Sequence, residues 1–294
     1  MAKSSTKNHL SGFRVFLNRT HSRRIYSQIA AWIVLLHLLS VAGSGTTIIV
    51  IRFDDAVVIV TDSKALDLTT GKSTSICKIQ TGRAFAWAVS GLVWDTTGGY
   101  NINATIARVA TKRDTLRHKV NELDERMPDV IRREAKRLRR IAPKVFERFI
   151  NSSEILEFSF IGSENGKMTD FFREYKIELV KGEVNVAWTW SRECPGKSCR
   201  YPQMTVMGQR MDVIEPYLVA HPAMYIPSSI EAAIQTGTNL VQMEAVASPD
   251  VVALPINVAV ISSHGVWWGP NNVQCKDQQK ARNPPAVTIA PKHP

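Results

Sequence analysis

Acidic residues are missing from the first 45 positions, although the whole chain contains 26 of them. The six lysines and arginines in this segment supply more than half of the formal net charge of +11. A protein that binds nucleic acid usually carries its positive charge as a patch on the folded domain. Here the charge gathers in the first segment and in one helical region, so no nucleic-acid partner is predicted.

The chain also lacks an apolar run of about 20 residues, the length that a transmembrane helix needs. Its main candidate covers residues 29–42 and is followed by small residues, which is typical of a secretory signal peptide. Arg23 and Arg24 precede this run and resemble a twin-arginine export signal. We therefore expect residues 1–45 to be a leader and the protein to be exported. The alternative is a retained signal anchor, through which residues 29–42 would keep the protein at a membrane.

Cysteine is scarce, with four residues in the chain. Cys194 and Cys199 flank a short loop that could close into a disulfide in an exported protein. The alternative, a metal knuckle, would require a second Cys/His pair at similar spacing, and the sequence contains none. No metal and no cofactor are predicted.

The stretch from residue 45 to residue 91 carries the strongest pattern. Residues 47–53 are rich in β-branched side chains, Asp54 and Asp55 form a turn signal, and residues 56–61 are a second apolar run. Two such runs around a short polar turn predict a β-hairpin. Both runs are nearly continuous in apolar residues, which indicates that both faces of the hairpin are covered.

Four short motifs within this stretch occur in a fixed order. Relative to Thr46, Asp62 lies sixteen positions further on and Lys78 thirty-two. This order and spacing resemble the start of a proteasome β-type subunit, a member of the N-terminal-nucleophile (Ntn) hydrolases. The matching segments are Gly45-Thr46-Thr47, Asp62-Ser63-Lys64-Ala65, Lys78-Ile79 and Ser90-Gly91-Leu92-Val93-Trp94-Asp95.

The resemblance implies a threonine hydrolase in which cleavage before Thr46 frees the nucleophile. A threonine hydroxyl needs a nearby base, and a free α-amine, with a pKa near 8, can accept its proton. By the same resemblance, Lys78 keeps the site positive, Asp62 orients Lys78, Gly91 supplies an oxyanion-hole N–H, and Asp250 completes the site around Thr46. Either signal peptidase or the protein itself could remove the leader.

The chain departs from the family pattern at several positions. One residue fewer separates Lys78 from Gly91, and Leu66 replaces the threonine of the substrate cleft. Gln209 stands where the family has a serine, and Asp250 lacks the Ser-Gly-Gly that follows the family aspartate.

The remaining pattern predicts strands, two helices, strands, a helix and a last strand. Two long helices are expected at residues 102–121 and 128–149, with Pro128 in the first turn of the second. A hairpin turn is expected at Lys181-Gly182. This order suits an α+β fold, and the resemblance implies the four-layer αββα sandwich of the Ntn hydrolases over residues 46–272. The polar, Pro-rich residues 273–294 are expected to be a disordered tail.

The sequence is compatible with three functions. The first is an exported, self-maturing peptidase or amidase that acts on peptide or amide substrates through Thr46. The second is a proteasome-like scaffold without catalysis that binds a partner, and the third is an acylase for small amides. Because the family forms closed rings, the resemblance also implies a homo-oligomeric ring, and a retained leader would imply membrane association.

Overall fold

In the computed structural model, the described residues are 46–66, 72–82, 85–95, 99–151, 155–196, 199, 201–208, 213–270, 272 and 275. All of them belong to one unit spanning residues 42–294. The predicted leader and nearly all of the predicted tail lie outside the described residues. No helix in the described part of the chain is long and apolar enough to cross a membrane.

The first sheet has five strands in the order β12-β1-β2-β13-β14, and all neighbours are antiparallel. The predicted hairpin forms its centre, and every residue of both hairpin strands is buried, as their continuous apolar runs predicted. The strands are β1 (Thr47–Arg52), β2 (Ala56–Thr61), β12 (Gln203–Gly208), β13 (Asn257–Ser262) and β14 (Gly265–Trp268).

The second sheet is also antiparallel and has the order β11-β10-β9-β6-β5. The predicted turn at Lys181-Gly182 joins β10 to β11, and both turn residues have positive φ, as a tight hairpin turn requires. Two small two-stranded sheets complete the strand set. The strands are β5 (Ile79–Thr81), β6 (Phe85–Gly91), β9 (Leu156–Glu164), β10 (Lys167–Val180), β11 (Glu183–Cys194), β3 (Lys64–Leu66) with β4 (Ser73–Ser75), and β7 (Trp94–Asp95) with β8 (Tyr100–Asn101).

The helical region after β8 differs from the prediction of two helices at 102–121 and 128–149. It forms α2 (Ile102–Ala110), α3 (Leu116–Ile141) and α4 (Pro143–Asn151). The predicted position of Pro128 in a first turn is wrong, because α3 runs through it. An interior proline costs about 3 kcal/mol, and the buried stripe of α3, which includes Leu123, Met127 and Ile131, offsets that cost. The second group of helices is α5 (Ile214–Ala220), the 3₁₀ turn η1 (Pro222–Tyr225) and α6 (Ile230–Ala247).

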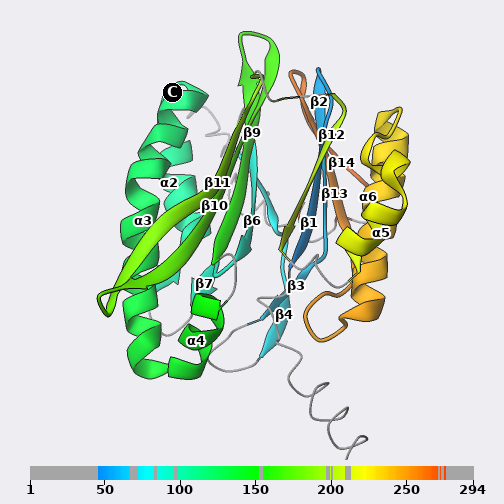
Figure 1. Cartoon of the computed structure of the whole chain (residues 1–294). Helices are drawn as coiled ribbons and strands as arrows, with labels where there is room; N and C mark the ends of the chain where they lie inside the picture. Colours follow the sequence, from blue (N-terminus) through cyan, green and yellow to red (C-terminus); the bar gives the residue numbers. More distant parts are fainter. Residues whose placement is uncertain are drawn as a thin grey trace, which may run out of the picture. The chain divides into compact units, whose positions relative to one another are not determined.

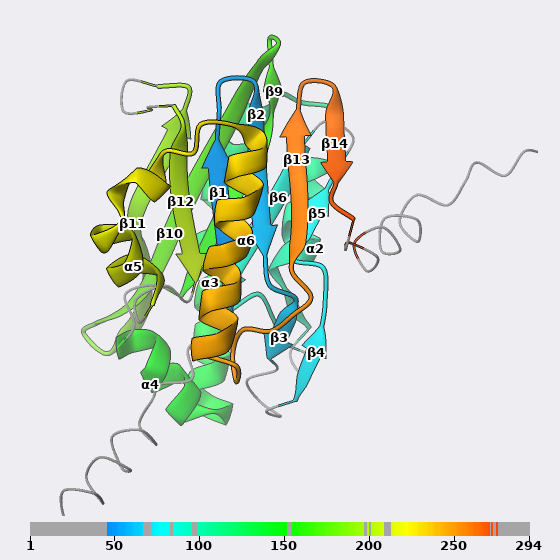
Figure 2. The same cartoon turned by 90° about the vertical axis from the view of Figure 1, so that its right-hand side faces the viewer.

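Successive side chains along β1 point alternately to the core between the two sheets and to the core under α5 and α6. On β1, Ile48 and Val50 face the second sheet, whereas Ile49 and Ile51 pack with residues of α5 and α6. In Figure 1, α2, α3 and α4 lie beside the second sheet, and α5 and α6 lie beside the first. Figure 2 shows α6 running across β1 and β2. The described chain is thus a mixed α and β protein with antiparallel sheets, compatible with the predicted α+β class.

Two disulfides join the four cysteines. Cys194 bonds Cys199, which confirms the disulfide alternative for this loop. Cys77 bonds Cys275, 198 positions later in the sequence. The second pairing was not predicted, because nothing in the spacing of these two residues suggests it.

Candidate active site

Three of the predicted site residues form one buried cluster. The Nζ atom of Lys78 donates to the Oγ1 atom of Thr46 at 2.8 Å and pairs with Oδ1 of Asp62 at 2.7 Å. Thr46, Asp62 and Lys78 are 6%, 0% and 4% exposed. Residues separated by up to 32 positions therefore meet in a site that excludes bulk water.

Asp62 is positioned by the end of the β1–β2 hairpin. It directly follows β2, where its backbone N–H donates to the carbonyl of Thr47 at 3.2 Å. Its carboxylate in turn accepts from the backbone N–H of Thr47 at 2.8 Å and from that of Lys64 at 2.9 Å. With Lys78 as a third donor, the carboxylate is held from three sides, which fixes its orientation toward the cation.

Lys78 reaches the cluster from the other sheet. It directly precedes β5, whereas Thr46 and Asp62 flank β1 and β2, so its side chain bridges the two sheets. Burial lowers the pKa of Lys78, and the charge and hydrogen bond of Asp62 oppose this shift. A buried ammonium group beside a hydroxyl is suited to stabilise an alkoxide.

A second buried group, which the sequence analysis missed, adjoins Thr46. Gly208 pairs with Thr47 across β12 and β1, and its backbone N–H donates to the carboxylate of Glu157. The hydroxyl of Ser90 donates to the same carboxylate oxygen at 2.8 Å. Glu157 and Ser90 are 1% and 0% exposed. This carboxylate therefore ties together β6, β9 and β12 beside Thr46.

Backbone conformation explains why glycine occupies position 208. Gly208 has a φ of +79°, and a Cβ atom built there would lie 1.9 Å from the carbonyl oxygen of Thr46. Any side chain would push the two strands apart at Thr46. The one signal in the sequence that could have found Glu157 is its place in the alternation of β9, where it shares the inward face with Ser159 and Ile161.

Gly91 lies at the end of β6, directly after Ser90, and has a φ of +91°. A Cβ atom there would lie 2.3 Å from the carbonyl oxygen of Ile155, so this position also requires glycine. The predicted site residue is thus placed beside the Ser90–Glu157 pair. Its proposed role as an oxyanion-hole donor remains a prediction.

Asp250 is placed differently from the other predicted site residues. It lies in the turn after α6 and is exposed. In the described structure its side chain makes no hydrogen bond or ion pair with Thr46, Asp62 or Lys78. Leu66 is half-buried at the end of β3, and Gln209 lies outside the described residues. The role of Asp250 in catalysis remains a prediction.

Cavities lined by described residues include two that lie beside helices. One, of about 280 Å³, is bounded by strands β9 to β12 and by α5 and includes Glu157, Trp190 and Met204 in its wall. It thus adjoins the Glu157 side of the site. The other, of about 590 Å³, lies between α2 and α3 and includes none of the predicted site residues. No cluster of metal-ligating side chains occurs among the described residues.

The cluster offers a hydroxyl, a cation and a carboxylate in hydrogen-bonded order. Such a set can activate an oxygen nucleophile if a base takes the hydroxyl proton. No known protein-family model matches the sequence, and no curated protein is significantly similar to it. The chemistry of the cluster is therefore inferred from its geometry and from the sequence motifs.

Proposed function

We propose that this chain is an Ntn hydrolase, similar to a proteasome β subunit, that cleaves peptide or amide bonds with Thr46 as its nucleophile. The observation that carries the proposal is the hydrogen-bonded cluster of Thr46, Lys78 and Asp62, buried where the two sheets meet. The motif spacing predicts the same three residues. Their contact in the fold supports the assignment.

The proposed reaction uses both polar groups of one residue. Once the chain is cut before Thr46, the neutral α-amine takes the proton of the Thr46 hydroxyl, and the oxygen attacks the substrate carbonyl carbon. The tetrahedral intermediate collapses to an ester on Thr46 as the leaving amine accepts a proton. Water then hydrolyses the ester and restores the hydroxyl. Throughout, the ammonium group of Lys78 favours the alkoxide and lowers the pKa of the amine.

The arrangement of the sheets and helices is consistent with this family. The helices beside each sheet, together with the two sheets facing each other, are the parts that a four-layer αββα sandwich requires. We infer that the fold is of this kind. The two disulfides support export to an oxidising compartment, where no cytosolic partner would be present.

The first test is the N-terminus of the protein purified from its own host. Intact mass and N-terminal sequencing should find a chain that starts at Thr46. A two-site electrophile, which bonds both the hydroxyl and the amine of an N-terminal threonine, should then label it once. A fully processed chain that does not react with this probe would contradict the proposal.

Two substitutions at Thr46 separate catalysis from folding. Thr46→Ala should abolish hydrolysis and labelling because the nucleophilic oxygen is lost, while the near-ultraviolet circular dichroism stays unchanged. Thr46→Ser is the matched control, because it keeps both the hydroxyl and the amine and should retain measurable activity. Normal turnover by a folded Thr46→Ala protein would overturn the mechanism.

A non-catalytic scaffold is the second candidate function. The observation that favours it is the exposure of Asp250, whose side chain makes no hydrogen bond with Thr46 in the described structure, together with the absence of the family Ser-Gly-Gly after that residue. A protein whose N-terminus remains blocked before Thr46 would support this candidate. For a processed and active protein, peptides tested against small acyl-amides would separate the peptidase from the acylase.

A further inference from the structure

The backbone at Lys78 lies just before a short strand at the edge of a sheet. The strand that follows it, β5, has three residues and lies at the edge of the second sheet, paired with β6. Residues 76–78 themselves belong to no strand. Short edge strands have little stability of their own, so the position of Lys78 must depend on other contacts.

One such contact is covalent and directly precedes Lys78. Cys77 forms the disulfide with Cys275, and the two residues are 2% and 1% exposed. Both side chains belong to the apolar core between the two sheets, together with Ile79, Ala259 and Ile261. The backbone beside Lys78 is therefore bonded to the segment that follows β14.

That segment is itself fixed to the first sheet. The backbone N–H of Val258, in β13, donates to Oδ1 of Asn272 at 2.9 Å. The amide nitrogen of Asn272 donates to the carbonyl oxygens of Val258 and Gly269. Asn272 is 1% exposed, so these bonds are shielded from water. The disulfide thus connects β5, at the edge of the second sheet, to β13 of the first.

This connection matters because the proposed site is split between the sheets. Thr46 and Asp62 are carried by the first sheet, and Lys78 comes from the second. A small separation of the sheet edges would move Lys78 away from both partners. Displacement of a catalytic group by about 1 Å can cost roughly 100-fold in rate.

We propose that the Cys77–Cys275 disulfide and Asn272 are positioning residues that hold Lys78 against Thr46 and Asp62. Asn272 and Cys275 then support the active site, although neither touches a reacting atom. The expected effect of these residues on catalysis rests on the proposed function. The geometric part, the placement of Lys78, can be tested without any substrate.

The second disulfide provides a matched control. Cys194 and Cys199 are five positions apart and close a local loop at the end of β11. Cys194 contacts Gln203, Cys199 contacts the carbonyl of Glu193, and neither belongs to the core cluster that contains Cys77. We therefore compare Cys77→Ala/Cys275→Ala with Cys194→Ala/Cys199→Ala, both in the full chain.

The first readout is the pKa of Lys78, measured by NMR on protein with isotope-labelled lysine side chains and assigned with Lys78→Met. Asp62 is a charged group in contact with Lys78, and its second oxygen accepts from the backbone N–H of Lys64. Burial holds the Lys78 pKa below its ordinary value. We expect it to rise toward that value in Cys77→Ala/Cys275→Ala and to stay unchanged in the control. An unchanged pKa in both variants would overturn the proposal.

A further variant covers the case in which Cys77→Ala/Cys275→Ala does not fold. Asn272→Ala keeps the disulfide but removes its anchor on β13. Its Lys78 pKa should shift in the same direction by a smaller amount. If the double-cysteine variant is unfolded, a wild-type value in Asn272→Ala would overturn the proposal.

The second readout is activity. Removal of the Cys77–Cys275 bond should lower kcat by about 100-fold and move the acidic limb of the pH–rate profile to higher pH, because the Thr46 amine loses a nearby cation. The control should stay within about twofold of the wild type. An unmoved profile, with only lower thermal stability, would indicate a purely structural disulfide. If processed wild-type protein proves inactive, the proposed function fails, while the NMR result still decides whether the disulfide positions Lys78.

Discussion

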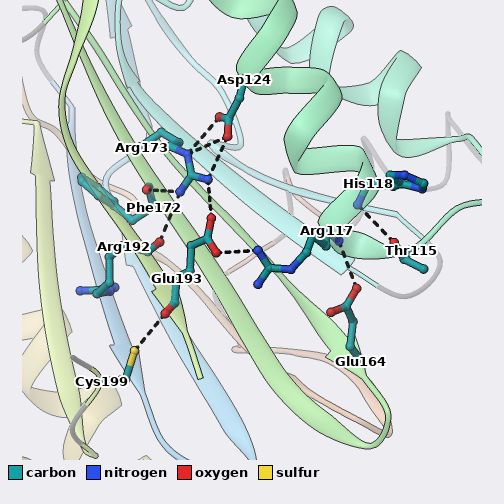
Figure 3. A network of polar contacts seen from close by, with 10 residues as sticks. All are labelled: Thr115, Arg117, His118, Asp124, Glu164, Phe172, Arg173, Arg192, Glu193 and Cys199. Atoms are coloured by element: carbon teal, nitrogen blue, oxygen red, sulfur yellow. Dashed lines mark hydrogen bonds and ion pairs between the residues drawn. The ribbon is translucent and has the colours of Figure 1, made fainter. Parts of the chain in front are cut away.

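Two buried cations, Lys78 and Arg173, are held in different ways. Lys78 pairs with Asp62 and donates to the hydroxyl of Thr46. Arg173 pairs with two carboxylates, those of Asp124 on α3 and Glu193 on β11. Figure 3 shows the Arg173 guanidinium between these two acids, with one further nitrogen bonded to the carbonyl of Phe172.

Their acid–base properties differ accordingly. Burial lowers the pKa of Lys78 more than Asp62 raises it. Burial also acts to lower the pKa of Arg173, but the hydrogen bonds and charges of Asp124 and Glu193 outweigh it, and the net shift is upward. Two acids thus outweigh the effect of burial on Arg173, whereas Asp62 only partly compensates the effect of burial on Lys78.

The comparison indicates how function can be recognised in a buried charge. Arg173 joins a helix to a sheet, and its charge is matched by acids on both sides. Burial of Lys78 is only partly compensated, and Lys78 lies next to Thr46, the proposed nucleophile; perturbed groups in such surroundings are candidates for catalysis. Substitutions at the two cations can test whether the Arg173 cluster serves stability and the Lys78 cluster serves catalysis.

The largest expected effect is the loss of activity in Lys78→Met. Removing the cation takes away the stabilisation of the Thr46 alkoxide and should lower kcat by about 1,000-fold. Arg173→Met, compared at equal concentration of folded protein, should lower kcat far less. The measurement is steady-state kinetics on the processed protein. Equal losses in the two variants would remove the distinction between the clusters.

Arg173→Met should instead lower the free energy of unfolding by about 3 kcal/mol, because it leaves the carboxylate of Asp124, whose side chain is only 12% exposed, without its cation. The matched control is Arg117→Met. Arg117 also binds Glu193, but its side chain is 54% exposed, and an exposed pair contributes less than about 1 kcal/mol. Urea denaturation of both variants measures the difference, and similar losses would show that burial is not what makes the Arg173 cluster strong.

A smaller effect is expected in the pH dependence of stability. The pKa of Lys78 is lowered on folding from its ordinary value of 10.5, so the unfolded chain binds more protons between the two values. The stability associated with Lys78 is therefore fully present above about pH 10.5, and it is lost as the pH falls through this window to the lowered folded pKa. The wild type should therefore gain stability relative to Lys78→Met as the pH rises toward 10.5.

Arg173→Met is the control for that titration. Because the pKa of Arg173 is raised above an already high value, this group does not titrate in the same range. The difference in unfolding free energy between wild type and Arg173→Met should stay constant from neutral pH to about pH 10. Parallel curves for wild type and Lys78→Met would contradict the lowered pKa of Lys78.

The parts of the molecule that could be predicted from the sequence are those set by local patterns. β-branched runs around Asp54-Asp55 predicted the β1–β2 hairpin, and Lys181-Gly182 predicted the β10–β11 turn. The positions of Asp62 and Lys78 followed from motif spacing, and the structure brings both residues to Thr46. Their chemical roles remain predictions.

Long-range contacts account for most of what the sequence did not reveal. Four cysteines allow three pairings, and spacing gave no reason to join Cys77 to Cys275. The contacts of Glu157 could not be predicted, because nothing near it in the sequence shows that Ser90 and Gly208 would meet its carboxylate. The helix bounds were wrong around Pro128, since a buried stripe along α3 outweighed the local effect of proline.

The smallest expected effect concerns Lys64, the second lysine at the site. Its Nζ atom donates to the carbonyl of Pro249 at 2.8 Å, while its backbone N–H holds Asp62 at 2.9 Å. Lys64→Met removes the first contact and keeps the second, so kcat should change by less than about fivefold. A loss comparable to that of Lys78→Met would mean that the site needs both charges. Such a result would assign the electrostatics of Thr46 to a pair of lysines rather than to the buried Lys78.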